Sequence, residues 1–172
     1  VLVNVLTGKP VADWSSFWKI PLATGREMVD SWVWPHVTTA HYAAPLMVER
    51  KAGLMVEVVE QHTIGYHGQF YFDMFEAALK RLAYGLATEL APKKVAAVAV
   101  TPGFMRTEAI LEGFGATEET WEVAARENPK AKSFGFAGSE TPCFVGRAVV
   151  SLAADPKIMA KSGGVYSSWG LS

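Results

Sequence analysis

Three short, almost wholly apolar runs and one weaker run near the C-terminus mark this chain. Runs of this kind are typical of strands in a parallel sheet, because helices cover both faces and no polar alternation is needed. The predicted strands span residues 1–5, 54–59, 95–100 and 163–169.

Between these runs lie longer segments in which apolar side chains recur at steps of three and four residues, as on one face of a helix. Met28, Trp32 and His36 begin such a stripe in the first segment, and Phe75 and Leu79 begin one in the second. The predicted helices span residues 24–49, 70–90 and from Ser139 or Thr141 to 154, with shorter helical pieces over 105–135.

The alternation of strands and helices predicts a single α/β domain over residues 1–172. The simplest arrangement is a Rossmann-like three-layer α/β/α fold with a parallel sheet, right-handed crossovers and helices on both faces. A parallel strand such as 1–5 is not normally left as an open edge. We therefore expect residues before Val1, or a second chain, to cover it, and we predict a homodimer or homotetramer.

Composition narrows the function classes. Sixteen basic residues balance seventeen acidic ones, which argues against nucleic-acid and membrane-surface partners. No apolar run approaches the roughly 20 residues that span a bilayer. The single cysteine, Cys143, excludes an intrachain disulfide and fits a reducing, cytoplasmic compartment. We expect Cys143 to be a small core residue, with a nucleophile at a helix N-terminus as the alternative.

Five motifs follow one another along the chain: Val1-Leu2-Val3-Asn4, Gly53-Leu54-Met55-Val56-Glu57-Val58, Glu76-Ala77-Ala78-Leu79, Leu86-Ala87-Thr88-Glu89-Leu90 and Pro102-Gly103-Phe104-Met105-Arg106-Thr107. In this order and spacing they resemble the motifs of the short-chain dehydrogenase/reductase family. The similarity covers nearly all of this chain but only about the C-terminal two-thirds of a family member, so the first nucleotide-binding strands are expected upstream of Val1.

The resemblance implies an NAD(P)-dependent oxidoreductase, and we expect a small-molecule, apolar substrate. It also implies that Asn4, Pro102, Gly103 and Thr107 contact the cofactor, provided that the nucleotide-binding half exists. If that half is absent, we expect no cofactor. Thr107 matches the family's turn residue at the nicotinamide amide, and the alternative is an ordinary strand-to-helix turn.

The family's reaction centre is altered in this chain. In the family, a Tyr and a Lys four residues later share one helical face and move the proton. The alignment places Phe72 at the Tyr position and Glu76 at the Lys position, while the Ser position falls on Val59 or Glu60 and the Asn position near Trp32. A phenyl ring cannot donate a proton and a carboxylate cannot supply the cation, so we predict a degenerate active site.

Other polar residues offer candidate chemistry, and the candidate catalytic residues are Glu60, His67, Tyr71 and Glu76. Tyr71 is one residue from the family's Tyr position, about 100° around the helix. Buried carboxylates among Glu57, Glu60, Asp73 and Glu76 would have raised pKa values and could act as general acid or base.

Simpler interpretations stand beside these. Glu76 could pair with Lys80 on a solvated helix face, and loop residues such as His67 could be ordinary surface residues. His36 and His41 are five residues apart and do not share a helical face, so no metal site is predicted. Some tryptophans are candidates to line an apolar pocket or to fill the core: Trp14, Trp18, Trp32 and Trp34.

Three functions stay open at this point. The first is a family homologue with NAD(P) and a degenerate active site. The second is a cofactor-independent hydrolase or lyase that acts on a small apolar ester or lactone, using Glu, His and Tyr in the vacated cleft. The third is a non-catalytic pseudoenzyme or assembly partner.

Overall fold

A four-stranded parallel sheet forms the centre of the computed structural model, which describes residues 1–6, 8, 13–60, 65–66 and 68–171. The strands follow one another in spatial order as they do in sequence. This arrangement confirms the predicted α/β, Rossmann-like class. The strands are β1 (Leu2–Asn4), β2 (Gly53–Val58), β3 (Val95–Thr101) and β4 (Val165–Ser167).

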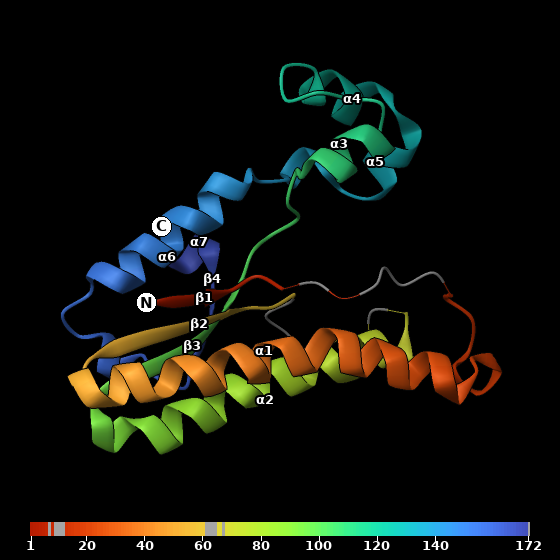
Figure 1. Cartoon of the computed structure of the whole chain (residues 1–172). Helices are drawn as coiled ribbons and strands as arrows, with labels where there is room; N and C mark the ends of the chain where they lie inside the picture. Colours follow the sequence, from red (N-terminus) through yellow and green to blue (C-terminus); the bar gives the residue numbers. More distant parts are fainter. Residues whose placement is uncertain (7, 9–12, 61–64, 67, 172) are drawn as a thin grey trace.

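Helices cover both faces of the sheet. The two long helices lie side by side on one face, and two others lie on the opposite face, as Figure 1 shows. The long helices are α1 (Leu22–Arg50) and α2 (Phe70–Leu90), and those opposite are α6 (Pro142–Ala154) and α7 (Ser168–Leu171). Short 3-10 helices connect larger elements, namely η1 (Phe17–Lys19), η2 (Ala91–Lys93), η3 (Phe136–Gly138) and η4 (Ile158–Ala160).

The side chains of β3 explain why two helical layers pack on one strand. Ala97 and Ala99 pack toward α1 and α2, while Val98 and Val100 pack against Leu152 of α6. Because successive side chains of a strand point to opposite faces, the apolar run buries all seven residues of the strand. A continuous apolar pattern is therefore the correct signature of this strand.

A small lobe lies beyond one end of the sheet (Figure 1). Its core is built from Ala125, Ala131 and Phe136, around which Phe104, Phe114 and Trp121 pack. The lobe's helices are α3 (Glu108–Gly113), α4 (Trp121–Glu127) and α5 (Pro129–Ser133).

Two local predictions are wrong. The last strand ends at Ser167 and the chain continues as α7, because the buried Ser168 hydroxyl donates to Glu140 and holds the chain at a turn. Cys143 is exposed rather than in the core. The face of α6 that packs on the sheet carries Val145 and Val149, and Cys143 lies about 200° around the helix from Val145.

Within the described part of the chain, no helix has the length and apolar character needed to span a membrane.

Candidate functional site

A cleft of about 1050 Å³ opens where β3 and β4 end, between the sheet and the lobe. The carboxyl ends of parallel strands are where open α/β sheets bind ligands, because the chain splays apart there. The walls of the cleft are formed by the end of β2, the turn after β3, the lobe and α7. The residues that line it include Trp14, Glu60, Thr101, Pro102, Gly103, Phe104, Met105, Thr107, Ile110, Phe114, Lys130, Phe134, Ser167 and Trp169.

Three of the four predicted cofactor residues line this cleft, namely Pro102, Gly103 and Thr107. The Thr107 hydroxyl accepts a 3.4 Å hydrogen bond from the Ile110 amide and so caps α3. A Cβ atom at position 103 would lie 3.2 Å from a carboxylate oxygen of Glu140, so glycine allows the turn to pack closely there. The fourth residue, Asn4, is not among the lining residues.

Glu140 holds the turn in place, a role that its sequence neighbourhood did not indicate. Its buried Oε1 atom accepts hydrogen bonds of 3.0 Å from the Gly103 amide and from the Ser168 hydroxyl. Its backbone pairs with the same turn, donating to Phe104 O and accepting from Arg106 N, both at 2.8 Å. The conformation of the turn that lines the cleft therefore depends on the buried Glu140 carboxylate.

Arg106 attaches the lobe to the rest of the molecule. Its Nη2 atom donates to Glu118 at 3.0 Å, and its guanidinium carbon lies 3.8 Å from the centre of the Trp121 ring. The same guanidinium donates to the backbone oxygen of Ser139. A planar guanidinium can stack and form several hydrogen bonds at once, which an ammonium cannot do.

Two of the candidate acidic residues, Glu60 and Glu76, contact each other at the edge of the cleft. Glu60 lines it, and the Glu60 amide donates a 2.8 Å hydrogen bond to Oε2 of Glu76. The Glu76 side chain is not solvated, since the residue is only 3% exposed. Burial first, and then the nearby Glu60 charge, raise the pKa of Glu76 to about 7. The interpretation of Glu76 as part of a solvated ion pair is therefore wrong.

An aromatic cluster surrounds Trp32 and Phe72, the positions to which the sequence resemblance assigns the family's Asn and Tyr. The Trp32 ring stacks on Phe75 at 4.4 Å between centroids, and the Phe72 ring meets Phe75 edge-on at 5.0 Å. Tyr71 is buried in the same cluster. Its ring packs closely on Gly25, since a Cβ atom at position 25 would lie 2.2 Å from Tyr71 Cζ.

The remaining candidates are dispersed. Tyr71 is not among the residues that line the cleft, and His67 lies outside the described residues. Of the four tryptophans, Trp14 lines the cleft and Trp32 fills the core, whereas Trp18 and Trp34 are exposed.

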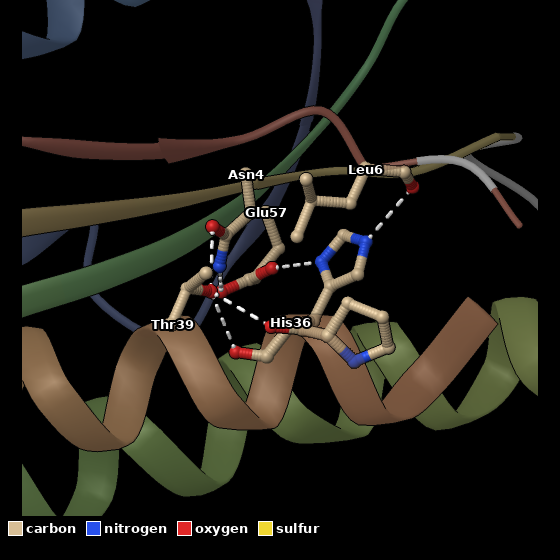
Figure 2. A network of polar contacts seen from close by, with 6 residues as sticks. Asn4, Leu6, His36, Thr39 and Glu57 are labelled. Carbon is tan, nitrogen blue, oxygen red and sulfur yellow. Dashed lines mark hydrogen bonds and ion pairs between the residues drawn. The ribbon is translucent and has the colours of Figure 1, made fainter. Parts of the chain in front are cut away.

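A second polar cluster, centred on Glu57, lies buried between the sheet and α1 (Figure 2). Asn4 and Glu57 are register partners on β1 and β2, and Asn4 Nδ2 donates to Glu57 Oε1 at 2.9 Å. Glu57 Oε2 lies 2.5 Å from His36 Nδ1, and His36 Nε2 lies 3.1 Å from the Leu6 carbonyl oxygen. The Thr39 hydroxyl donates to Asn4 Oδ1 at 2.8 Å.

The protonation of His36 follows from its partners. A carbonyl oxygen can only accept, so Nε2 carries a proton and donates to Leu6. Burial, the largest effect, lowers the pKa of His36, but the hydrogen bonds to Glu57 and Leu6 and the nearby carboxylates outweigh it and raise the pKa. These contacts favour the protonated form of the His36 ring. Its sequence signals were a glutamate and an asparagine within otherwise apolar strands.

This chain is similar to known proteins in sequence and in structure. A family model described as enoyl-(acyl carrier protein) reductase matches residues 11–164. The chain is 33% identical over 157 residues to dehydrogenase/reductase SDR family member 1 of Mus musculus, and 30% identical over 159 residues to the Homo sapiens protein of that name. Each match covers 91% of this chain and 49% of the relative, so the chain spans about half the length of these curated relatives.

Solved structures share the fold. Halohydrin dehalogenase HheC, bound to ethyl (2S)-oxiran-2-ylacetate, superposes with a TM-score of 0.77 at 18% identity, over 97% of this chain and 66% of that one. ElxO with NADP bound superposes with a TM-score of 0.73 at 20% identity, over 96% of this chain and 64% of that one.

Proposed function

This chain belongs to the short-chain dehydrogenase/reductase family, and we propose that it forms the nicotinamide- and substrate-binding part of an NAD(P)-binding protein with a degenerate active site. The observation that carries this proposal is the position of the Pro102–Thr107 turn in the wall of the cleft, at the carboxyl ends of the strands. Because the chain spans about half the length of its curated relatives, the activity of the whole protein is part of the proposal.

The residues present fit the nicotinamide end of the cofactor. Pro102, Gly103 and Thr107 would hold it, since all three line the cleft as parts of one turn. The ElxO structure with NADP bound shows that a protein of this fold takes such a cofactor. When bound, NAD(P)H supplies the hydride.

The proton is the missing part of the family's chemistry. Phe72 is buried among aromatic rings and has no proton to donate, and Glu76 cannot provide the cation that lowers the pKa of a neighbouring tyrosine. Burial raises the pKa of Glu76 to about 7, but Glu76 is not among the residues that line the cleft, and its carboxylate accepts from the Glu60 amide. We therefore expect cofactor binding with little or no hydride transfer.

The cofactor-independent hydrolase has less support. It would need glutamate, histidine and tyrosine to meet in the cleft, and of the described candidates only Glu60 lines it. A non-catalytic role is compatible with the proposal, because a degenerate site can bind a cofactor without turning it over. The homo-oligomer and the cytoplasmic location stay predictions.

Calorimetric titration of the full-length protein with NADPH and with NADH tests the proposal. We expect saturable binding of at least one cofactor. Ile110→Trp, which places a bulky ring in the cleft wall, should weaken this binding, whereas Val150→Trp, at an exposed position on α6, should not. The absence of binding at millimolar cofactor, or equal affinity of both variants and the wild type, would contradict it.

A further inference from the structure

The walls of the cleft are apolar on the lobe side. Phe104, Ile110 and Phe114 form the lobe wall, and several aromatic rings of the lining are turned toward solvent. Trp14 is 59% exposed, Phe134 64% and Trp169 65%. Large apolar side chains gathered around one concave surface mark a binding site for an apolar ligand, because leaving them in water is unfavourable.

Only two of the described lining residues, Glu60 and Lys130, carry a formal charge. Glu60 follows β2 and lies on the sheet side, whereas Lys130 belongs to α5 and lies on the lobe side. The cleft therefore has an acidic residue on one side, a basic residue on the other and apolar rings between them.

Lys130 lies near an aromatic ring of the cleft wall. Its Nζ atom lies 5.9 Å from the centre of the Phe114 ring, which is within reach of a cation–π interaction. Among the described residues, no carboxylate forms an ion pair with Lys130. The Asn128 side chain caps α5 by accepting from the Lys130 and Ala131 amides, which fixes the start of this short helix.

We propose that the cleft takes an amphiphile whose apolar body packs on the lobe's aromatic rings and whose anionic head, a carboxylate or a phosphate, is bound by Lys130. This inference rests on the proposed function for the identity of the site, and it names the class of molecule that shares the cleft with the nicotinamide end. The negative charge of Glu60 disfavours an anion on the sheet side, so the head lies on the lobe side and the body extends toward Gly103.

The size of the cleft is consistent with two occupants. At about 1050 Å³ its volume is slightly above the range of roughly 300–1,000 Å³ that is typical of small-molecule sites. Lysine provides a point charge without the planar fork of arginine, so it selects for charge more than for the shape of the head. A carboxylate and a phosphate are therefore both suitable heads.

The experiment measures the affinity of the full-length protein, without cofactor, for decanoate, decyl phosphate and decanol, followed by tryptophan fluorescence. Trp14 and Trp169 line the cleft and serve as reporters. The test variant is Lys130→Met, which keeps an apolar side chain of similar length. The matched control is Lys132→Met, which removes an exposed charge from the same helix but does not line the cleft.

We expect Lys130→Met to weaken binding of at least one anionic probe about three- to fivefold, the effect of losing one exposed ion pair, and to leave decanol unchanged. Lys132→Met should leave all three affinities unchanged. The relative loss for decanoate and decyl phosphate identifies the preferred head.

Three results would overturn the inference: no binding of any probe, no loss of anion affinity in Lys130→Met, or an equal loss in Lys132→Met. These titrations contain no cofactor, so their outcome can be interpreted even if the protein does not bind NAD(P)H. Lys130-dependent binding without cofactor binding would support the inference and contradict the proposed function.

Discussion

The Nδ1 atom of His36 lies 2.5 Å from the Oε2 atom of Glu57, and both side chains are completely buried. Each residue has a second partner, since His36 also donates to the Leu6 carbonyl and Glu57 also accepts from Asn4. Removing two charges from water is costly, and their attraction offsets that cost only when the other polar atoms are satisfied as well. Here the pair joins α1, β2 and the end of β1.

Replacing Glu57 with glutamine tests the charge state of this pair. Glutamine can accept from Asn4 and donate to a neutral His36, so the hydrogen bonds survive while the negative charge is lost. Without the Glu57 charge, the lowering of the His36 pKa by burial is opposed only weakly. We therefore expect the pKa of His36 to fall below its ordinary value of 6.5. An NMR titration of the His36 ring measures this change. Glu49→Gln, an exposed change on α1, should leave the titration as it is in the wild type.

The same pair contributes to stability in a defined pH range. Because the pKa of folded His36 is raised above 6.5, its contribution is fully present below pH 6.5 and is lost as the pH rises through the folded pKa. Glu57→Ala leaves the buried His36 ring and Asn4 amide without their shared partner and should lower the free energy of unfolding by about 3–5 kcal/mol at pH 6. Urea unfolding measures this loss. A smaller loss of unfolding free energy in Glu57→Ala than in Glu57→Gln would refute the ion pair.

Glu76 should show the opposite kind of pH dependence from an ordinary surface carboxylate. Its pKa is about 7 in the folded state against 4.5 as the reference value, so the folded chain binds more protons between these values. The free energy of unfolding therefore falls as the pH rises from 4.5 toward 7 and beyond. The total effect is about 3 kcal/mol.

Glu76→Gln isolates this contribution, because an amide oxygen can still accept from the Glu60 amide without ever becoming charged. We expect the variant to match the wild type near pH 4 and to be more stable by up to about 3 kcal/mol at pH 8. Urea unfolding at the two pH values is the measurement. Glu89→Gln, an exposed change on α2, provides the control. A difference that does not grow with pH would rule out the raised pKa.

Two glycines in the long helices should respond oppositely to alanine. At Gly25 the new Cβ would lie 2.2 Å from Tyr71 Cζ, whereas at Gly85 nothing lies within 4 Å. Gly25→Ala should therefore lower the free energy of unfolding by about 1–3 kcal/mol through overpacking. Gly85→Ala should raise it by about 0.5–1 kcal/mol, because alanine is the better helix former. Thermal unfolding of the two variants gives both signs, and stabilisation at position 25 would contradict the close packing of α1 on α2.

The attachment of the lobe should depend on Arg106. Arg106→Lys keeps the charge but loses the double contact with Glu118 and the stacking on Trp121. We expect amide hydrogen exchange to accelerate in α3, α4 and α5, corresponding to a loss of about 2 kcal/mol of local stability, and to stay unchanged in β2 and β3. Arg126→Lys, an exposed change on α4, should leave the exchange unaltered. Uniform acceleration across the sheet would instead assign Arg106 a global role.

The elements of this fold are largely encoded in local patterns. The apolar run at residues 95–100 and the stripe through Phe75 and Leu79 lie in a buried strand and a core-facing helix, because burial on two faces or on one face imposes those periods on any chain. The motif ending in Thr107 likewise predicts a turn at the sheet edge, and the turn does line the cleft.

The polar contacts could not be predicted in this way. Glu140 contacts Gly103 across 37 positions of sequence, and Asn4 contacts Glu57 across 53. Neither partner carries a local signal of the other, because each hydrogen bond forms only after the crossover helices bring the strands together. The pKa of Glu76 depends in the same way on burial beneath the Glu60 segment. Periodicity records which face of an element is buried, whereas the environment of a buried charge is set by whatever distant segments pack against that face.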